Sequence, residues 1–248
     1  MKGQTTEPTV NSLEVMQRAE DLLYRFQDLS AEVTLKTTQA DGREHIHRSR
    51  WFWKNFERRD GIDSKAIFYT TFPPAVRGET FLIWDYSKPG KPDDLWLYQP
   101  DQRQTRRLTT RDRHESFHGT DLTFEDLGQR QLDLEHHRVL REETCERVPC
   151  YVIESVPMEA DSPYSRRLSW VAKDRWTVFK IEFFDRQASL LKTQTVLWKK
   201  QDDLWLWTGT RVVNHQTGSR TILDVTDLVF NSGLIDQRFE LRALSRPP

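Results

Sequence analysis

Several segments of this chain are apolar at successive positions, and this pattern limits the folds available to it. Neighbouring residues of a β-strand point to opposite faces of the sheet, so Phe81–Trp84 and Leu95–Tyr98 would be apolar on both faces. Trp51–Trp53 and Leu204–Trp207 repeat the pattern. An antiparallel sheet with one wet face needs only one apolar face. The second apolar face must therefore be covered by helices, by a second sheet, by a partner or by an apolar ligand.

Aromatic residues supply much of this apolar surface. The 248 residues include nine Trp, thirteen Phe and six Tyr, although only 36% of the chain is hydrophobic. The 37 Lys and Arg balance the 38 Asp and Glu, for a net charge of −1. Because nucleic-acid binding depends mainly on cations that neutralise phosphates, this balance argues against a nucleic-acid partner. No apolar run approaches the roughly 20 residues of a membrane-spanning helix.

One amphipathic helix precedes a long series of predicted strands. Apolar residues recur every three or four positions over Leu13–Phe26, and Asn11 is placed to cap the helix. Strand-like segments then follow at near-regular spacing from residue 31 to residue 230, separated by turns such as Asp41-Gly42. This spacing predicts a single antiparallel sheet, sandwich or barrel, with no domain boundary.

A single long helix is little cover for so wide a sheet. If the sheet is strongly curved, an apolar cavity remains on its concave side, and burying an acyl chain there gains about 0.8 kcal/mol per CH₂. The alternative is a tightly packed two-layer core without a cavity. The aromatic residues on the two-faced strands are therefore either lipid contacts or plain core. The candidates for lipid contact are Trp51, Trp53, Phe81, Trp96, Trp205 and Trp207.

Four motifs occur in an order that is typical of one known family. They are Pro74–Leu82 (PAVRGETFL), Asp94–Pro100 (DLWLYQP), Arg106–Leu108 (RRL) and Phe117–Leu127 (FHGTDLTFEDL). In this order they resemble the outer-membrane lipoprotein-sorting (LolA-like) proteins, in the branch often found beside RND-type exporters. The resemblance extends over most of the chain from Leu13 onward.

The resemblance implies a mainly β (α+β) fold. We expect a half-open antiparallel β-barrel of roughly eleven strands, with the N-terminal helix and short helices covering its concave face. Residues 1–10 would be a disordered start of the mature chain, and residues 11–248 one LolA-like carrier domain. The chain has no apolar segment of a signal peptide at its start, so the resemblance implies that this peptide has been removed and that the protein is periplasmic.

The implied function is a carrier that moves a lipid or a lipoprotein acyl chain toward the outer membrane. The lid arginine of the best-known lipoprotein carrier aligns with no residue here, so the cargo is either a lipoprotein or a free lipid. The alternative function is a periplasmic adaptor of an RND-type exporter, with a filled barrel and no ligand. We expect a monomer without a cofactor.

A basic run and an acidic residue are candidates for polar contacts. Arg103, Arg106 and Arg107 could bind an anionic head group or a transporter surface, or could be solvated charges that protect a strand edge. Asp121 could pair with this run, or it could cap a helical turn.

Two cysteines lie five positions apart, and the sequence carries no signature of catalysis. Cys145 and Cys150 could form a disulfide across a tight hairpin, or they could be two free thiols near a turn. No His or Cys spacing typical of a zinc site occurs, and no Gly-x-Ser-x-Gly turn is present. We therefore expect neither a metal nor enzyme activity.

Overall fold

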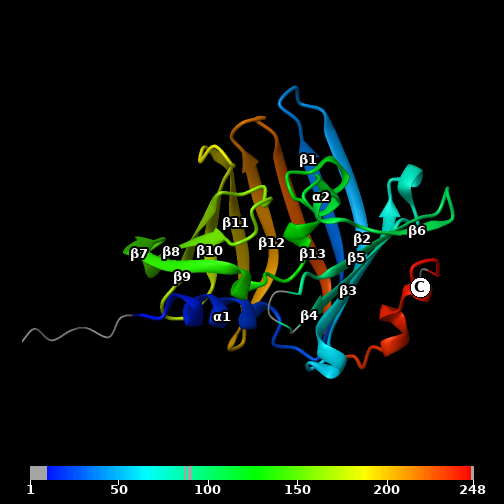
Figure 1. Cartoon of the computed structure of the whole chain (residues 1–248), viewed down its shortest axis with the longest axis horizontal. Helices are drawn as coiled ribbons and strands as arrows, with labels where there is room; N and C mark the ends of the chain where they lie inside the picture. Colours follow the sequence, from blue (N-terminus) through cyan, green and yellow to red (C-terminus); the bar gives the residue numbers. More distant parts are fainter. Residues whose placement is uncertain (1–9, 87, 89–90, 247–248) are drawn as a thin grey trace, which may run out of the picture.

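The computed structural model describes residues 10–86, 88 and 91–246, and it consists of one strongly curved antiparallel sheet with few helices (Figure 1). Residues 1–9, most of the segment predicted to be disordered, lie outside the described residues. The spatial order of the strands is β6-β5-β4-β3-β2-β1-β13-β12-β11-β10-β9-β8-β7. The first and last strands therefore pair in the middle of the sheet, and β6 and β7 form its two edges.

The strands and helices have the following bounds. The strands are β1 (Asp28–Thr38), β2 (Glu44–Asn55), β3 (Ile62–Phe72), β4 (Thr80–Tyr86), β5 (Asp94–Gln99), β6 (Gln104–Arg107), β7 (Glu135–Cys145), β8 (Val148–Pro157), β9 (Arg166–Ala172), β10 (Val178–Phe184), β11 (Leu190–Gln201), β12 (Leu204–Asn214) and β13 (Arg220–Phe230). The helices are α1 (Ser12–Leu23) and α2 (Thr110–Arg113), with 3₁₀ turns η1 (Arg59–Gly61), η2 (Pro74–Val76), η3 (Phe117–Gly119), η4 (Glu125–Leu127), η5 (Leu132–Leu134), η6 (Asp236–Phe239) and η7 (Leu241–Ala243).

The predicted fold class is confirmed: the protein is mainly β, the sheet is antiparallel and unclosed, and the long helix is N-terminal. The sheet has thirteen strands, where roughly eleven were expected. The edge strand β6 is short, and all four of its residues are exposed.

Helix α1 begins where the sequence predicts. The side chain of Asn11 accepts hydrogen bonds from the backbone N–H groups of Leu13 and Glu14, at 3.1 and 3.3 Å. The helix ends at Leu23, three residues before the apolar repeat does. Phe26 lies beyond the helix and stacks on Phe230 of β13, with ring centroids 4.0 Å apart. These contacts hold the helix across the lower part of the sheet (Figure 1).

Strands β2–β5 are apolar on both faces, as predicted, and each face has its own cover. The inner face, which we define as the face toward α1, carries Trp51 and Phe81 in one buried cluster. The outer face carries Ile67 and Leu82, which pack in a second cluster against Phe239 and other residues of the chain's C-terminal segment. Residues 234–244, the C-terminal cover, thus shield the outer face (Figure 1). On this side the second apolar face is covered by the chain itself.

Among the described residues, α1 and the central connection (residues 108–134) cover the inner face, and Pro92 and Glu159 of two further loops line the same cavity. Helix α1 packs against Ile153, Val171 and Val178 of strands β8–β10. The central connection lies in front of the sheet with α2 and the turns η3–η5 (Figure 1). Its residues Phe117 and Phe124 join the buried cluster of the inner face. The short helical turns predicted within this connection are therefore present.

Removing the main anchor of the C-terminal cover should destabilise the fold. Phe239 is completely buried and its ring lies 6.1 Å from that of Phe56. We expect Phe239→Ala to lower the free energy of unfolding by about 3–5 kcal/mol, because it leaves a cavity in the outer cluster. Leu241→Ala is the matched control, since Leu241 is 44% exposed. Urea unfolding measures both variants, and equal small losses would contradict a packed cover.

Candidate functional site

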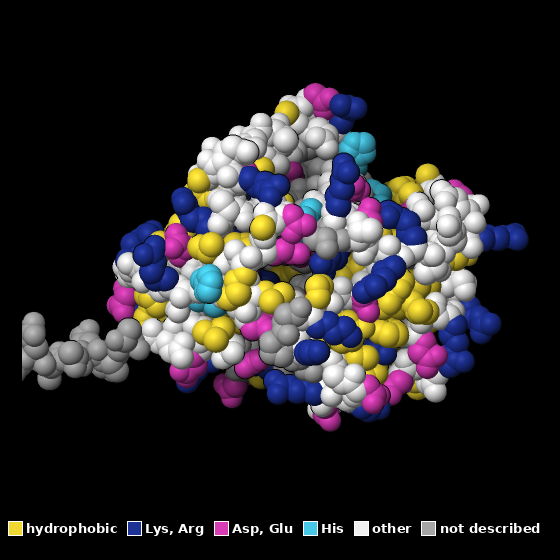
Figure 2. Space-filling view, in the orientation of Figure 1, with side chains coloured by type: hydrophobic (Ala, Val, Ile, Leu, Met, Phe, Trp, Pro, Cys, Tyr) yellow, Lys and Arg dark blue, Asp and Glu magenta, His cyan; other side chains and the backbone are white. Residues whose placement is uncertain are grey.

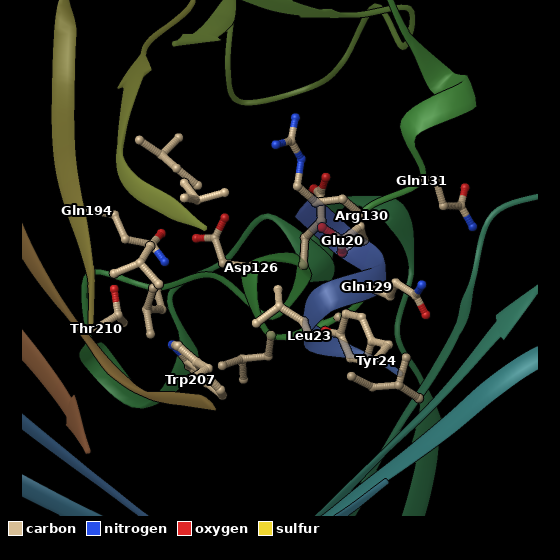
Figure 3. A pocket seen from close by; sticks show the side chains of 18 of the residues that line it. Glu20, Leu23, Tyr24, Asp126, Gln129, Arg130, Gln131, Gln194, Trp207 and Thr210 are labelled. Carbon is tan, nitrogen blue, oxygen red and sulfur yellow. Dashed lines mark hydrogen bonds between the residues drawn. The ribbon is translucent and has the colours of Figure 1, made fainter. Parts of the chain in front are cut away.

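A cavity lies between the inner face of the sheet, α1 and the central connection (Figure 3). It measures about 270 Å³. On the same measure a site for a single buried water needs only about 10–15 Å³, so this is a space of ligand size. Figure 2 shows a hollow near the middle of this face of the molecule, with hydrophobic and acidic side chains at its rim.

Most of the cavity wall is apolar. Leu23 and Tyr24 reach it from α1 and the residue that follows, and Trp207 reaches it from β12 on the opposite side (Figure 3). Strands from the whole width of the sheet contribute the rest. The other apolar lining residues are Met16, Ala19, Leu22, Phe26, Leu29, Val33, Trp51, Phe68, Ile83, Pro92, Leu95, Leu122, Phe124, Leu127, Leu134, Pro157, Val178, Ile181, Phe183, Val196, Trp198, Trp205, Leu206, Leu223, Leu228 and Phe230. Such a surface suits a hydrocarbon chain.

The remainder of the wall is polar and comes mainly from the central connection and its neighbours. Glu20 of α1 and Arg130 lie side by side, with Gln129 and Gln131 nearby (Figure 3). The other charged lining residues are Asp93, Arg113, Glu125, Asp126, Glu135, Glu159 and Arg167. The cavity therefore has an apolar part and a charged part, as an amphiphile does.

Buried ion pairs hold the charged part in place. Glu135 pairs with both Arg130 and Arg167, and Arg167 also lies 3.5 Å from Glu125. Burial alone would raise the pKa of Glu135, but the two guanidinium groups bring it below its ordinary value. Since Arg130 belongs to the connection and Arg167 to β9, these pairs tie the cover to the sheet.

A second buried pair fastens the connection to β11. Lys192 donates to Asp126, with the nitrogen 2.6 Å from the carboxylate oxygen, and also to the backbone carbonyl of Asp121 at 2.8 Å. The hydroxyl of Tyr164 donates to the same carboxylate. Although burial opposes the charge of Asp126, Lys192 lowers the pKa of that carboxyl below its ordinary value. Asp126 is thus a structural anchor and stays ionised.

The charged part also contains carboxyls that resist ionisation. Burial raises the pKa of Asp93 to about 7, although Tyr86 N–H and Gln131 donate to it. Behind it, burial and then the charge of Asp93 hold the pKa of Asp85 well above its ordinary range. Burial likewise raises the pKa of Glu20. Burial therefore disfavours the charged form of all three carboxyls.

The structure separates the six aromatic candidates into three groups. Trp51, Trp205 and Trp207 line the cavity. Trp53 and Phe81 are in the inner cluster without lining the cavity. Trp96 lies on the outer face against Trp84, with ring centroids 4.8 Å apart, and does not line the cavity. Its register explains this, because its neighbours in β5 point to the inner face.

The basic run lies at the edge of the sheet and forms local pairs. Arg106 lies 3.2 Å from Asp112, and Arg107 pairs with Asp94. Arg103 is exposed in the turn before β6. Asp121 does not join them: its carboxylate accepts hydrogen bonds from Ser219 at 2.5 Å and from Thr221 at 2.8 Å.

The two cysteines are free thiols in the structure. Cys145 ends β7 and Cys150 lies in β8, joined by a tight turn. Burial and then Cys150 raise the pKa of the Cys145 thiol to about 12. The disulfide stays a prediction.

Sequence reasoning missed the charged lining. Glu20 lies beside Asp21 in a helix that carries several charges, and Arg167 follows Arg166, so neither residue stands out in the sequence. The pairing of Arg167 with Glu135 brings together residues 32 positions apart, which no local pattern reveals.

Comparisons with known proteins identify a family and solved structures that this chain resembles. A family model described as an uncharacterized protein matches residues 62–246. The chain belongs to this family. A DUF1329 family protein from Desulfovibrio piger is similar over 96% of this chain and 100% of its own, with 28% sequence identity and a TM-score of 0.87.

Two further solved structures resemble the chain. A domain from Vibrio parahaemolyticus that is named for outer membrane lipoprotein sorting has 27% identity and a TM-score of 0.86, over 95% of this chain and 98% of its own. A LolA superfamily protein from Nitrosomonas europaea has 21% identity and a TM-score of 0.75, over 94% and 99%. The resemblance to LolA-like proteins is confirmed. No curated protein matches the sequence, and no helix among the described residues could cross a membrane.

The raised pKa of Asp93 predicts how the stability of the protein depends on pH, and this dependence tests the description of the charged lining. A carboxyl whose folded pKa lies above its unfolded value, near 4, adds stability at low pH and loses it as the pH rises through about 7. Asp93→Asn keeps the acceptor oxygen but not the charge. We expect it to be more stable than the parent by about 1–2 kcal/mol at pH 8, with no advantage at pH 4.

Urea unfolding from pH 4 to pH 8 measures the effect of Asp93→Asn. Asp101→Asn, which changes an exposed turn carboxylate, is the control and should follow the parent curve. A variant curve parallel to that of the parent over this range would show that Asp93 ionises as an ordinary carboxyl.

Proposed function

We propose that this protein is a carrier that shelters the hydrocarbon part of a lipid or a lipoprotein in the cavity beneath α1. The observation that carries the proposal is the cavity itself, apolar over most of its wall and large enough for one acyl chain. Burial of each CH₂ there contributes about 0.8 kcal/mol. The cover consists of α1, the central connection and short loops, none of which belongs to the sheet, and this offers a route for entry without unfolding the sheet.

The solved structures support the cellular setting of this proposal. The domain from Vibrio parahaemolyticus is named for outer membrane lipoprotein sorting. By analogy, the chain would work in the periplasm and carry its cargo toward the outer membrane, binding it without catalysis. In this proposal residues 11–248 form one carrier domain that is monomeric. Its partner is an RND-type exporter, which contacts the surface formed by Arg103, Arg106 and Arg107.

The adaptor alternative requires an interior that is filled by the protein's own side chains. A cavity of about 270 Å³ favours the carrier instead. One experiment distinguishes the two functions, because only a carrier needs the free volume inside the sheet in order to bind its ligand.

Partly filling the cavity should weaken binding. Val196 of β11 lines the cavity, whereas the adjacent Thr195 is exposed on the other face of the strand. We expect Val196→Trp to weaken binding of the uncharged dye N-phenyl-1-naphthylamine and of lauroyl lipids by about 30-fold, since the indole displaces two or three methylenes. Fluorescence titration measures the affinity.

Thr195→Trp adds the same side chain to the same strand and should bind like the parent. Thermal unfolding checks that both variants fold. If the parent binds neither the dye nor any acyl lipid, or if both variants bind equally well, the cavity is not a binding site and the carrier proposal fails.

A further inference from the structure

One of the three arginines in the cavity wall has no carboxylate partner. Arg130 and Arg167 both pair with Glu135. Arg113, the third, forms no ion pair within the described part of the chain. Its Nη1 donates a long hydrogen bond, at 3.5 Å, to the backbone carbonyl of Asp93. The wall therefore presents one guanidinium group that an incoming anion could bind.

Two carboxyls lie close enough for their charges to act on Arg113, although neither forms an ion pair with it. They belong to Asp93 and Glu159. The carboxylate of Asp93 accepts hydrogen bonds from Gln131 and from the backbone N–H of Tyr86 instead. Burial raises the pKa of Asp93 to about 7, so that this group is partly protonated at neutral pH. Glu159 is therefore the main competitor for the charge of Arg113.

Arg113 lies at an end of the cavity that meets solvent. It is half-buried on α2, and the exposed Glu159 lines the same space from the loop between β8 and β9. The same two segments also border a second hollow of about 420 Å³, to which α2 contributes Arg111 and the loop contributes Asp161. Arg186 lines this hollow as well. Figure 1 shows α2 in front of the sheet. Further basic side chains therefore flank this end of the cavity.

Building on the proposed carrier function, we propose that Arg113 binds the oxyanion of an anionic amphiphile whose acyl chain lies in the cavity. A guanidinium group can donate two parallel hydrogen bonds to a carboxylate or a phosphate. The methylenes would be buried against the apolar wall, while the head group stays at the end that meets solvent. A free fatty acid and an acyl phospholipid are the two sources of such an anion.

A ligand series with one acyl chain tests this assignment. At pH 7, the dye N-phenyl-1-naphthylamine would be displaced from the full-length protein by laurate, lauroyl lysophosphatidylglycerol and uncharged 1-lauroylglycerol, each below its micellar concentration. We expect the anions to bind about tenfold more tightly than 1-lauroylglycerol, the effect of one charge-assisted hydrogen bond. The laurate arm reports a fatty acid and the lysophospholipid arm a phospholipid.

Two variants test the role of Arg113 with opposite signs. Arg113→Gln keeps amide donors but removes the charge, so the anions should lose their tenfold advantage while 1-lauroylglycerol binds as before. Glu159→Gln removes the competing carboxylate and should tighten anion binding about threefold. Arg211→Gln is the matched control, because Arg211 is exposed on β12 next to Thr210, which lines the cavity. It should bind all three ligands like the parent.

The outcomes separate this inference from the proposed function. If 1-lauroylglycerol displaces the dye as well as both anions do, the inference is overturned and the carrier function stands. An anion advantage that survives in Arg113→Gln, or that disappears equally in Arg211→Gln, also overturns it. Thermal unfolding checks the variants, and if Arg113→Gln does not fold, a failure of Glu159→Gln to tighten anion binding decides against the inference. If no ligand displaces the dye, both the inference and the carrier function fail.

Discussion

A wide apolar sheet must hide both of its faces from water, and this constraint governs the whole molecule. The outer face of β2–β5 is sealed by the C-terminal cover, where Phe239 and Leu244 are fully buried. The inner face has α1 and the central connection over it, and the loops before β5 and after β8 reach the same cavity. The thirteen-stranded sheet is curved, so that Trp51 of β2 and Trp207 of β12 meet edge to face, and a cavity of about 270 Å³ remains beneath the cover. The interior of the curved sheet is therefore an apolar cavity.

The cover over this space is fastened by charge. Lys192 pairs with Asp126, and Glu135 pairs with Arg130 and Arg167, so that the connection is tied to β11 and β9. Buried ion pairs contribute little net stability, because desolvation of the ions offsets their attraction, but they specify where a segment lies. The pairs also fix the positions of charged side chains in the cavity wall.

Local patterns in the sequence predict where the helix and the strands lie, but they do not predict which face of the sheet each side chain occupies. Asn11 and the turn at Asp41-Gly42 mark element boundaries through local hydrogen bonding and positive φ. The face of Trp96, in contrast, depends on which side the C-terminal cover packs. That cover rests on a few apolar residues in a polar stretch, which periodicity cannot detect. The charged lining depends on pairs distant in sequence, so only Trp51, Trp205 and Trp207 were correctly placed in the cavity wall.

The central claim is that the interior exists to hold a hydrocarbon guest, and native mass spectrometry addresses it most directly. The protein would be produced with a cleavable secretion signal, recovered from the periplasm without detergent and analysed under non-denaturing conditions. The account predicts a species heavier than the chain by the mass of an acyl lipid, lost when the cavity is filled by a bulky side chain. Protein recovered only at the mass of the bare chain, from cells rich in lipids, would contradict it.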